Sequence, residues 1–120
     1  MSLDLYIVLE EKEVWSGNIT HNLTKMAEKI MCGFFPRLNL YDLLWRPEEN
    51  GFTKVTIEYI ILLMAGAGYL KSHREILEQY NPENGWGSYD TLVKFVSSLI
   101  EFLLVTPNIE NEKYEIHSSI

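Results

Sequence analysis

Hydrophobic and polar residues alternate near both ends of the chain, as they do in a strand that lays one face on a core. Over residues 3–9 an apolar side chain occupies every second position. The acidic residues 10–13 predict an exposed turn, residues 14–15 a short return strand, and residues 16–17 the end of that unit. The alternation returns over residues 113–117. Because a lone hairpin is marginally stable in water, we expect these segments to form one small antiparallel sheet.

Between the two ends, apolar residues recur at the spacing of helices. The first helix is expected to start from an N-cap at Asn18 or Thr20 and to stop at Gly33 and Pro36. Further helices are predicted over residues 38–45, 55–70, 72–80 and 88–105. In the last of these, apolar side chains cover more than half of the helix circumference, so we expect neighbours on both of its flanks.

Two short segments add detail to this fold. Ser72-His-Arg-Glu75 has the pattern of a capping box, which predicts that a helix starts at Ser72. The Ala-Gly-Ala-Gly segment 65–68 lacks side-chain bulk and predicts close approach of another backbone. We therefore predict one α+β domain over residues 1–120. A small antiparallel sheet from both termini packs on a bundle of about five helices, with the helix 88–105 at the centre.

Charge and cysteine content restrict the partners and the compartment. The chain has 17 acidic and 10 basic residues, a formal net charge of −7. A nucleic-acid partner is not expected, because phosphate neutralisation needs clustered lysine and arginine. The single Cys32 cannot form an internal disulfide, which fits a reducing compartment. No leader precedes Leu3, and the apolar run 59–70 is too short to span a membrane, so we expect a cytoplasmic protein without membrane association.

The first candidate site lies at the expected start of the first helix. Free backbone N–H groups there, surrounded by polar side chains, can hold a phosphate or a carboxylate. The side chains are those of Asn18, Thr20, His21 and Asn22. The alternative is plain capping by asparagine and threonine, with His21 in solvent. Asn22 borders the apolar face of the helix and is the better candidate.

Two further groups of residues can contact a ligand. Asn84, Trp86 and Tyr89 combine flat apolar rings with hydrogen-bonding groups, which suits an aromatic ligand. The alternative is that Trp86 fills the core beneath a tight turn. Trp45 and Arg46 form the third group, in which the guanidinium pairs with an anion or stacks on the indole. A surface salt bridge to Glu48 or Glu49 explains that arginine equally well.

Catalytic and metal-binding patterns find little support in the sequence. Cys32 has no histidine or acid at a recognisable spacing, which favours a buried structural thiol. His21, His73 and His117 lack the spacing of a metal site. We therefore expect no catalytic residue, no metal and no cofactor.

Several stretches resemble one family along nearly the whole chain. They are Asp4-Leu-Tyr-Ile7, Asn18-Ile-Thr-His-Asn-Leu23 with Met26-Ala27, Leu44-Trp-Arg-Pro-Glu-Glu49, and Asn81-Pro-Glu-Asn-Gly-Trp-Gly87 with Tyr89. In this order they resemble a family of small uncharacterised proteins encoded by bacteriophages, prophages and bacteria. The resemblance implies a setting, the cytoplasm of a bacterial host cell, and brings no assigned activity. The segments 33–36 and 59–70 depart from the family pattern, which indicates a changed partner surface or a homo-oligomer contact.

The leading hypothesis is a non-enzymatic accessory protein of phage type, which holds a small polar, nucleotide-like ligand. Sequestering a host defence signal is the counter-defence role that this setting suggests. In a second hypothesis the acidic segments 10–13 and 110–115 bind and inhibit a basic host protein. A third hypothesis, a small hydrolase-like enzyme with His21 as general base, lacks a visible nucleophile or partner acid.

Overall fold

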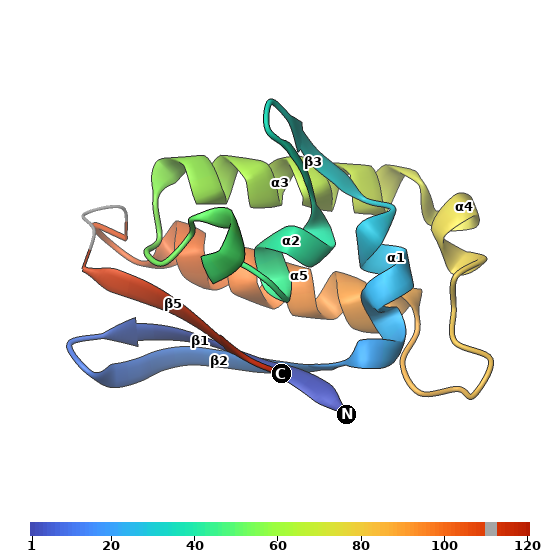
Figure 1. The fold of residues 1–120 in the computed structure, drawn as a ribbon, viewed down its shortest axis with the longest axis horizontal. Coiled ribbons are helices and arrows are strands. Elements are labelled where there is room, and N and C mark those ends of the chain that lie inside the picture. Colours follow the sequence, from blue (N-terminus) through green and yellow to red (C-terminus); the bar gives the residue numbers. More distant parts are fainter. Residues whose placement is uncertain (110–112) are drawn as a thin grey trace.

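An antiparallel sheet forms one side of the molecule, and the helices lie in layers over its inner face (Figure 1). The computed structural model describes residues 1–109 and 113–120. The sheet consists of β1 (Ser2–Leu9), β2 (Lys12–Thr20) and β5 (Tyr114–Ser119), in the order β2-β1-β5. The predicted α+β class and the sheet built from both ends of the chain are confirmed.

The central strand β1 explains why the alternating pattern was so clear. Leu3, Leu5 and Ile7 are fully buried, whereas the residues between them face outward. Both neighbours pair with it antiparallel, so that Asp4 lies opposite Asn18 of β2 and Ser119 of β5. Every second side chain of a strand points to the same face, and here that face lies on the helices.

Strand β2 is much longer than the predicted return strand. The expected end at residues 16–17 is wrong, because β2 continues to Thr20 and pairs along the whole of β1. Gly17 interrupts the apolar alternation for a steric reason. A Cβ added there would lie 2.6 Å from Trp15 Cη2 and 2.7 Å from Phe95 Cε2. The position therefore belongs to the core face although it has no side chain.

The long helices α3 (Ile57–Ser72) and α5 (Tyr89–Val105) lie side by side, with α5 between α3 and the sheet (Figure 1). Leu92, Val96, Leu99 and Leu103 of α5 are at most 1% exposed. The helix starts at Ser88, whose N–H donates to Thr91 Oγ1 at 3.0 Å, as a capped start requires. No helix in the residues that the structure describes is long and apolar enough to cross a membrane.

The predicted first helix is divided into three elements. After β2 the chain forms the 3₁₀ turn η1 (His21–Leu23) and the short helix α1 (Thr24–Glu28), and then enters β3 (Met31–Phe34). Asn18 is therefore a strand residue and not a cap, and the expected continuation of the helix toward Gly33 is wrong, because α1 ends at Glu28. β3 pairs with β4 (Arg37–Asn39) as a hairpin, and Ile30 accepts a backbone bond from Leu40.

The remaining helices are short. α2 (Leu40–Leu44) starts with a capping box between Asn39 and Asp42, with both bonds at 2.9 Å. η2 (Glu48–Asn50) follows, and α4 (Arg74–Glu78) comes after α3. The capping box predicted at Ser72 is wrong, because Ser72 ends α3 and its hydroxyl donates to the Tyr69 carbonyl.

Of the two glycines in the small-residue segment of α3, Gly66 lies close to another element among the described residues and Gly68 does not. A Cβ at Gly66 would lie 2.6 Å from Cys32 Sγ, so the β3 side chain occupies that space. The partner is a side chain and not the expected backbone. A Cβ at Gly68 would meet nothing within 4 Å, because this position faces away from the core.

Candidate functional site

Five of the residues singled out in the sequence line one cavity of about 480 Å³. They are Asn18, Thr20, Asn22, Asn84 and Trp86, joined by Met1 and Ser2. They come from the end of β2, from η1 and from the loop between α4 and α5. The volume is in the range of small-molecule sites.

Glycine conformation places the loop of residues 81–87 against the end of β2. Gly85 and Gly87 have φ of 74° and 89°, values that side-chain-bearing residues rarely adopt. A Cβ at Gly87 would also lie 2.7 Å from Thr20 Cγ2, so the backbone approaches the strand closely. The Asn84 side chain accepts a bond of 2.9 Å from the Trp86 N–H and fixes the turn. Trp86 is consequently held at the edge of the cavity.

The cavity offers neutral hydrogen-bonding groups and one flat ring. Asn18 Nδ2 donates to Asp4 Oδ1 at 2.7 Å and to Ser2 Oγ at 2.9 Å, which leaves its carbonyl oxygen as an acceptor. Asn22 makes no side-chain hydrogen bond with the described residues, and the Asn84 Nδ2 group is likewise open to a ligand. The Trp86 side chain is 71% exposed. Its indole is therefore a surface for stacking and not the predicted core plug.

His21 and Trp45 are directed away from this cavity and toward each other. Trp45 is 2% exposed, and its Nε1 donates to His21 Nδ1 at 2.9 Å. Its ring also stacks on Tyr41, with the ring centroids 5.7 Å apart. The Nδ1 lone pair of His21 thus accepts the indole N–H and is engaged inside the protein.

Arg46 is engaged by its neighbours on the surface. It forms a salt bridge of 3.2 Å with Glu49, one of the two alternatives considered from the sequence, and its Nε donates to Tyr41 Oη. The hydrogen bond that Arg46 donates to Tyr41, with a smaller contribution from the charge of Glu49, raises the pKa of this arginine above its ordinary value. Arg46 and Trp45 border a separate hollow of about 120 Å³.

Tyr89 is a structural anchor and does not line the cavity. It is 3% exposed, and its hydroxyl donates to the Leu70 carbonyl, which ties the start of α5 to the end of α3. The Arg74 guanidinium lies over the ring, 4.9 Å from its centroid. Burial raises the pKa of Tyr89 above its ordinary value.

Backbone N–H groups at the two helix starts are already paired. The Asn22 N–H donates to Thr20 Oγ1 at 3.3 Å, and the Tyr89 N–H donates to Asn81 Oδ1 at 2.7 Å. The Ser88 N–H is bonded to Thr91. An anionic ligand therefore does not meet free first-turn donors at these positions, unlike in the arrangement expected from the sequence.

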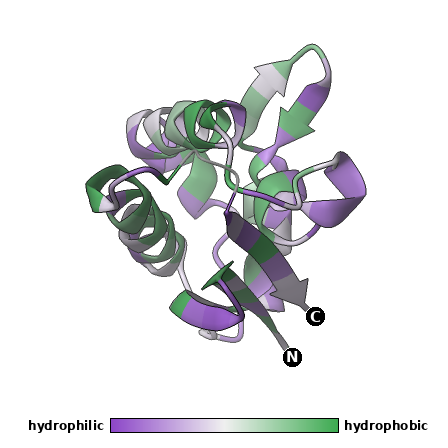
Figure 2. Ribbon diagram, turned by 90° about the vertical axis from the view of Figure 1, so that its left-hand side faces the viewer, coloured by the Kyte–Doolittle hydropathy of each residue, from purple (hydrophilic) through white to green (hydrophobic). Residues whose placement is uncertain are grey.

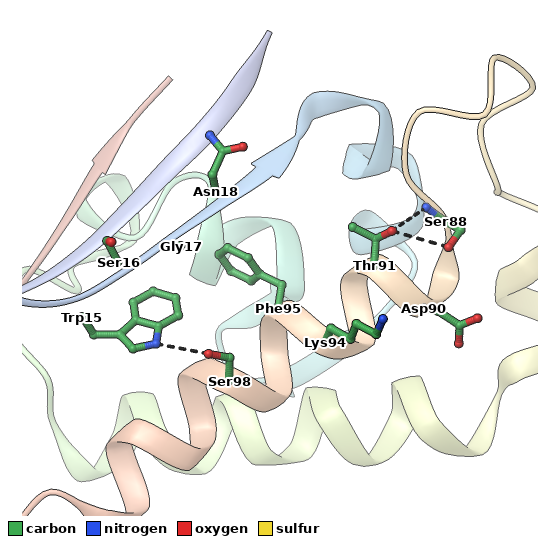
Figure 3. A pocket seen from close by; sticks show the side chains of 10 residues that line it. All are labelled: Trp15, Ser16, Gly17, Asn18, Ser88, Asp90, Thr91, Lys94, Phe95 and Ser98. Carbon is green, nitrogen blue, oxygen red and sulfur yellow. Dashed lines mark hydrogen bonds between the residues drawn. The ribbon is translucent and has the colours of Figure 1, made fainter.

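A second cavity of about 450 Å³ lies between β2 and the first half of α5 (Figure 3). Trp15 packs edge-on against Phe95 and donates from Nε1 to Ser98 Oγ at 3.3 Å. Gly17 lets these two rings approach the β2 backbone, because a Cβ there would lie 2.6 Å from Trp15 and 2.7 Å from Phe95. Sequence reasoning missed this cavity because it ended the strand at residue 17. Asn18 lines both cavities.

Cys32 is buried behind α3 at 7% exposure. Burial, helped by the charge of Asp42, raises the pKa of this thiol to about 12. The thiolate needed for nucleophilic attack is therefore scarce at neutral pH. Within residues 1–109 and 113–120, no group of three histidine, cysteine or carboxylate side chains is arranged to hold a metal ion.

Comparison with known proteins gives no relative from which a role can be transferred. No protein-family model, curated protein or solved structure matches the chain. The fold and the cavity define an α+β domain with a polar site beside an exposed tryptophan. The functional argument therefore depends on the geometry of that site.

Proposed function

We propose that this chain is a non-enzymatic binding protein that holds a small, polar, nucleotide-like ligand in the cavity beside Trp86. The observation that carries the proposal is that residues from three separate elements meet at one cavity. Asn18, Asn22 and Trp86 come from a strand, a 3₁₀ turn and a distant loop, and they line the same cavity. Asparagine amides and an exposed indole are the groups that bind a planar ring with polar edges.

The chemistry of the lining indicates how such a ligand lies. Its base stacks on Trp86, an interaction worth about 1–3 kcal/mol per base. Asn22 and Asn84 offer donors and acceptors to the polar edges of the base. These two residues also line an adjoining hollow that contains Lys25. A phosphate directed toward Lys25 gains a positive charge that the side chains around Trp86 do not supply.

In the bacterial setting that the family resemblance implies, such binding sequesters a nucleotide signal of the host. Sequestration needs affinity and no chemistry, which suits a cavity lined by amides and hydroxyls. A phage-type accessory protein with this property acts in counter-defence, in the cytoplasm of the host cell. The resemblance supports this role, and the cavity supports only the ligand class.

Replacing Asn22 by alanine is expected to weaken nucleotide binding by about 0.5–1.5 kcal/mol, the worth of a hydrogen bond between neutral groups. Replacing Trp86 by alanine is expected to weaken it by about 1–3 kcal/mol, the worth of a stacked base. Each variant removes either the hydrogen bond of Asn22 or the stacking on Trp86, and leaves the other contact with the ligand. Calorimetric titration against cyclic and linear nucleotides measures the affinities. Melting curves are expected to shift little for the Trp86 variant, because its side chain is mostly in solvent.

Trp86→Phe is the matched control for stacking, since it keeps a flat ring and is expected to retain most of the affinity. Ile76→Ala, at a half-exposed position on α4, controls for unspecific effects. If the wild type binds no nucleotide of the panel, the proposal fails. Strong destabilisation of the Trp86 variant would instead identify it as a structural residue.

A second candidate function is inhibition of a basic host protein through acidic side chains. Glu10 and Glu11 form the exposed tip of the β1–β2 hairpin, both with positive φ, and Glu13 follows at the start of β2. The hairpin tip that carries these residues lies at one end of the sheet (Figure 1). The other acidic segment predicted for this role, 110–115, lies partly outside the described residues. Within it, Glu115 pairs with His117 at 2.9 Å.

Reversing Glu10, Glu11 and Glu13 to lysine is expected to abolish capture of such a partner and to leave the melting temperature nearly unchanged. Surface charges mainly control association rate and salt dependence. Pull-down from a bacterial lysate at low and high salt measures the capture, with Trp86→Ala as the control variant. Equal capture by the reversed variant would exclude this second function.

A further inference from the structure

The outward face of α3 carries apolar side chains that the fold does not cover. Ile57 and Ile61 are each 59% exposed, and Met64 is 47% exposed. At helical spacing these residues form one stripe with Ala65, Gly68 and Ser72, opposite the buried residues Tyr59, Leu63 and Leu70. A helix of a monomer normally presents polar residues on this face.

The β3–β4 hairpin extends the apolar surface beside α3. Its tip stands clear of the rest of the fold in two perpendicular views (Figure 1, Figure 2). Phe34 is 72% exposed and Phe35 is fully exposed. With about 200 Å² for a phenylalanine and somewhat less for isoleucine and methionine, the stripe and the tip leave roughly 600 Å² of apolar surface open. A patch of this size lies at the upper end of what monomers expose, and such patches are often functional.

The α3 stripe is complementary to itself in size. Its large residues occupy the first half and its small residues the second half. Residues at equal distances before and after the midpoint between Met64 and Ala65 form pairs of one large and one small side chain. The pairs are Ile57 with Ser72, Ile61 with Gly68, and Met64 with Ala65. The open position at Gly68 provides a notch of the kind that an isoleucine side chain fills. A two-fold axis requires this reciprocity, because each contact between two residues then occurs twice.

The charges at the two ends of α3 favour an antiparallel arrangement of two copies of this helix. Glu58 is exposed at the start of α3 and Lys71 at its end, and they are related by the same central point. When two copies of the helix run antiparallel, the acidic end of one lies beside the basic end of the other. The helix dipoles then oppose as well. A parallel arrangement would place the acidic ends together, which costs energy.

We propose that a second copy of this chain covers this face, with the two α3 helices antiparallel around Met64 and Ala65. Two copies then bury about 1,200 Å² of apolar surface, which reaches the lower end of specific interfaces. The two hairpin tips, which flank α3 on one side, come together on the same side of the dimer. The cavity beside Trp86 stays open, because β2 and the loop before α5 lie away from the outward face of α3 (Figure 1).

Gly68→Leu tests the arrangement without disturbing the fold. A Cβ at this position meets no atom of another element within 4 Å among the described residues, and leucine favours the helix more than glycine does. We expect the wild type to be a dimer in sedimentation equilibrium over a hundredfold range of concentration. The variant is expected to dimerise at least about tenfold more weakly, because it fills the notch.

Ile61→Glu and Ile76→Glu form a matched pair, since both residues are more than half exposed and only Ile61 belongs to the stripe. We expect the first to be monomeric and the second to remain dimeric. A wild type that is monomeric at every concentration overturns the proposal, and so does a Gly68→Leu dimer of unchanged strength. Nucleotide titration of the Ile61 variant separates this outcome from a failure of the ligand proposal, because monomers keep an open cavity.

Discussion

Truncation of Leu99 to alanine is expected to lower the free energy of unfolding by about 2–5 kcal/mol, the range for a large-to-small change in a packed core. Leu99 is fully buried in α5, the helix that contacts both α3 and β2. Neighbours on both flanks are held in place by other contacts and cannot fully collapse into the space left by the side chain. Urea unfolding measures the loss as a lower midpoint with an unchanged slope.

Leu104→Ala provides the comparison on the same helix. Its side chain is 59% exposed, and its truncation is expected to change the stability by less than about 0.5 kcal/mol. Equal effects at the two positions would show that α5 is not packed as described. A loss below about 1 kcal/mol at Leu99 would have the same meaning.

Replacement of Trp45 by alanine is expected to cost about 3–5 kcal/mol, because it removes the largest side chain in the fully buried core. The substitution also leaves Tyr41 without its stacking partner and His21 Nδ1 without its indole donor. Thermal and chemical unfolding both measure this change. The expected loss is a substantial share of the total stability of a domain of this size.

Trp45→Phe separates the hydrogen bond from the packing. A phenyl ring keeps most of the apolar contact and cannot donate to His21, so the expected loss is only about 1–2 kcal/mol. If Trp45→Ala kept its stability and instead abolished nucleotide binding, the residue would belong to a ligand site. That outcome would contradict its burial.

Strong periodicity explains which elements could be predicted. Apolar residues occupy every second position over residues 3–9 because β1 is the central strand and only one of its faces lies on the helices. The start of α5 was recognisable because Ser88 follows two flexible glycines and precedes a wide apolar surface. In both cases the local preference and the tertiary packing favour the same structure.

Where packing overrides the local pattern, the prediction failed. Ile30 and Met31 continue a helical spacing from Met26, yet the chain leaves the helix and pairs β3 with β4. The hairpin is stabilised by contact with α3, which no local pattern records. Ser72 similarly has the residues of a capping box, but α3 extends through it.

For the candidate site, the residue types were informative and the geometry was not. The asparagines and Trp86 line one cavity, as their polar and aromatic character suggested. Tyr89 and Trp45 have the same character, yet each uses its polar group for a bond inside the protein. An aromatic ring with a polar tip serves a core and a binding site equally well. Only the position of the backbone decides between these uses.

The central position of β1 also affects the tendency of the chain to aggregate before its synthesis is complete. One edge of β1 pairs early with β2, whereas the partner of its other edge, β5, is translated more than a hundred residues later. Until β5 is made, one edge of β1 has a row of unpaired backbone groups, next to leucines that are buried in the folded protein. Such an edge is a template for pairing between nascent chains. Until β5 pairs there, this edge of β1 is a place where incompletely folded chains can associate.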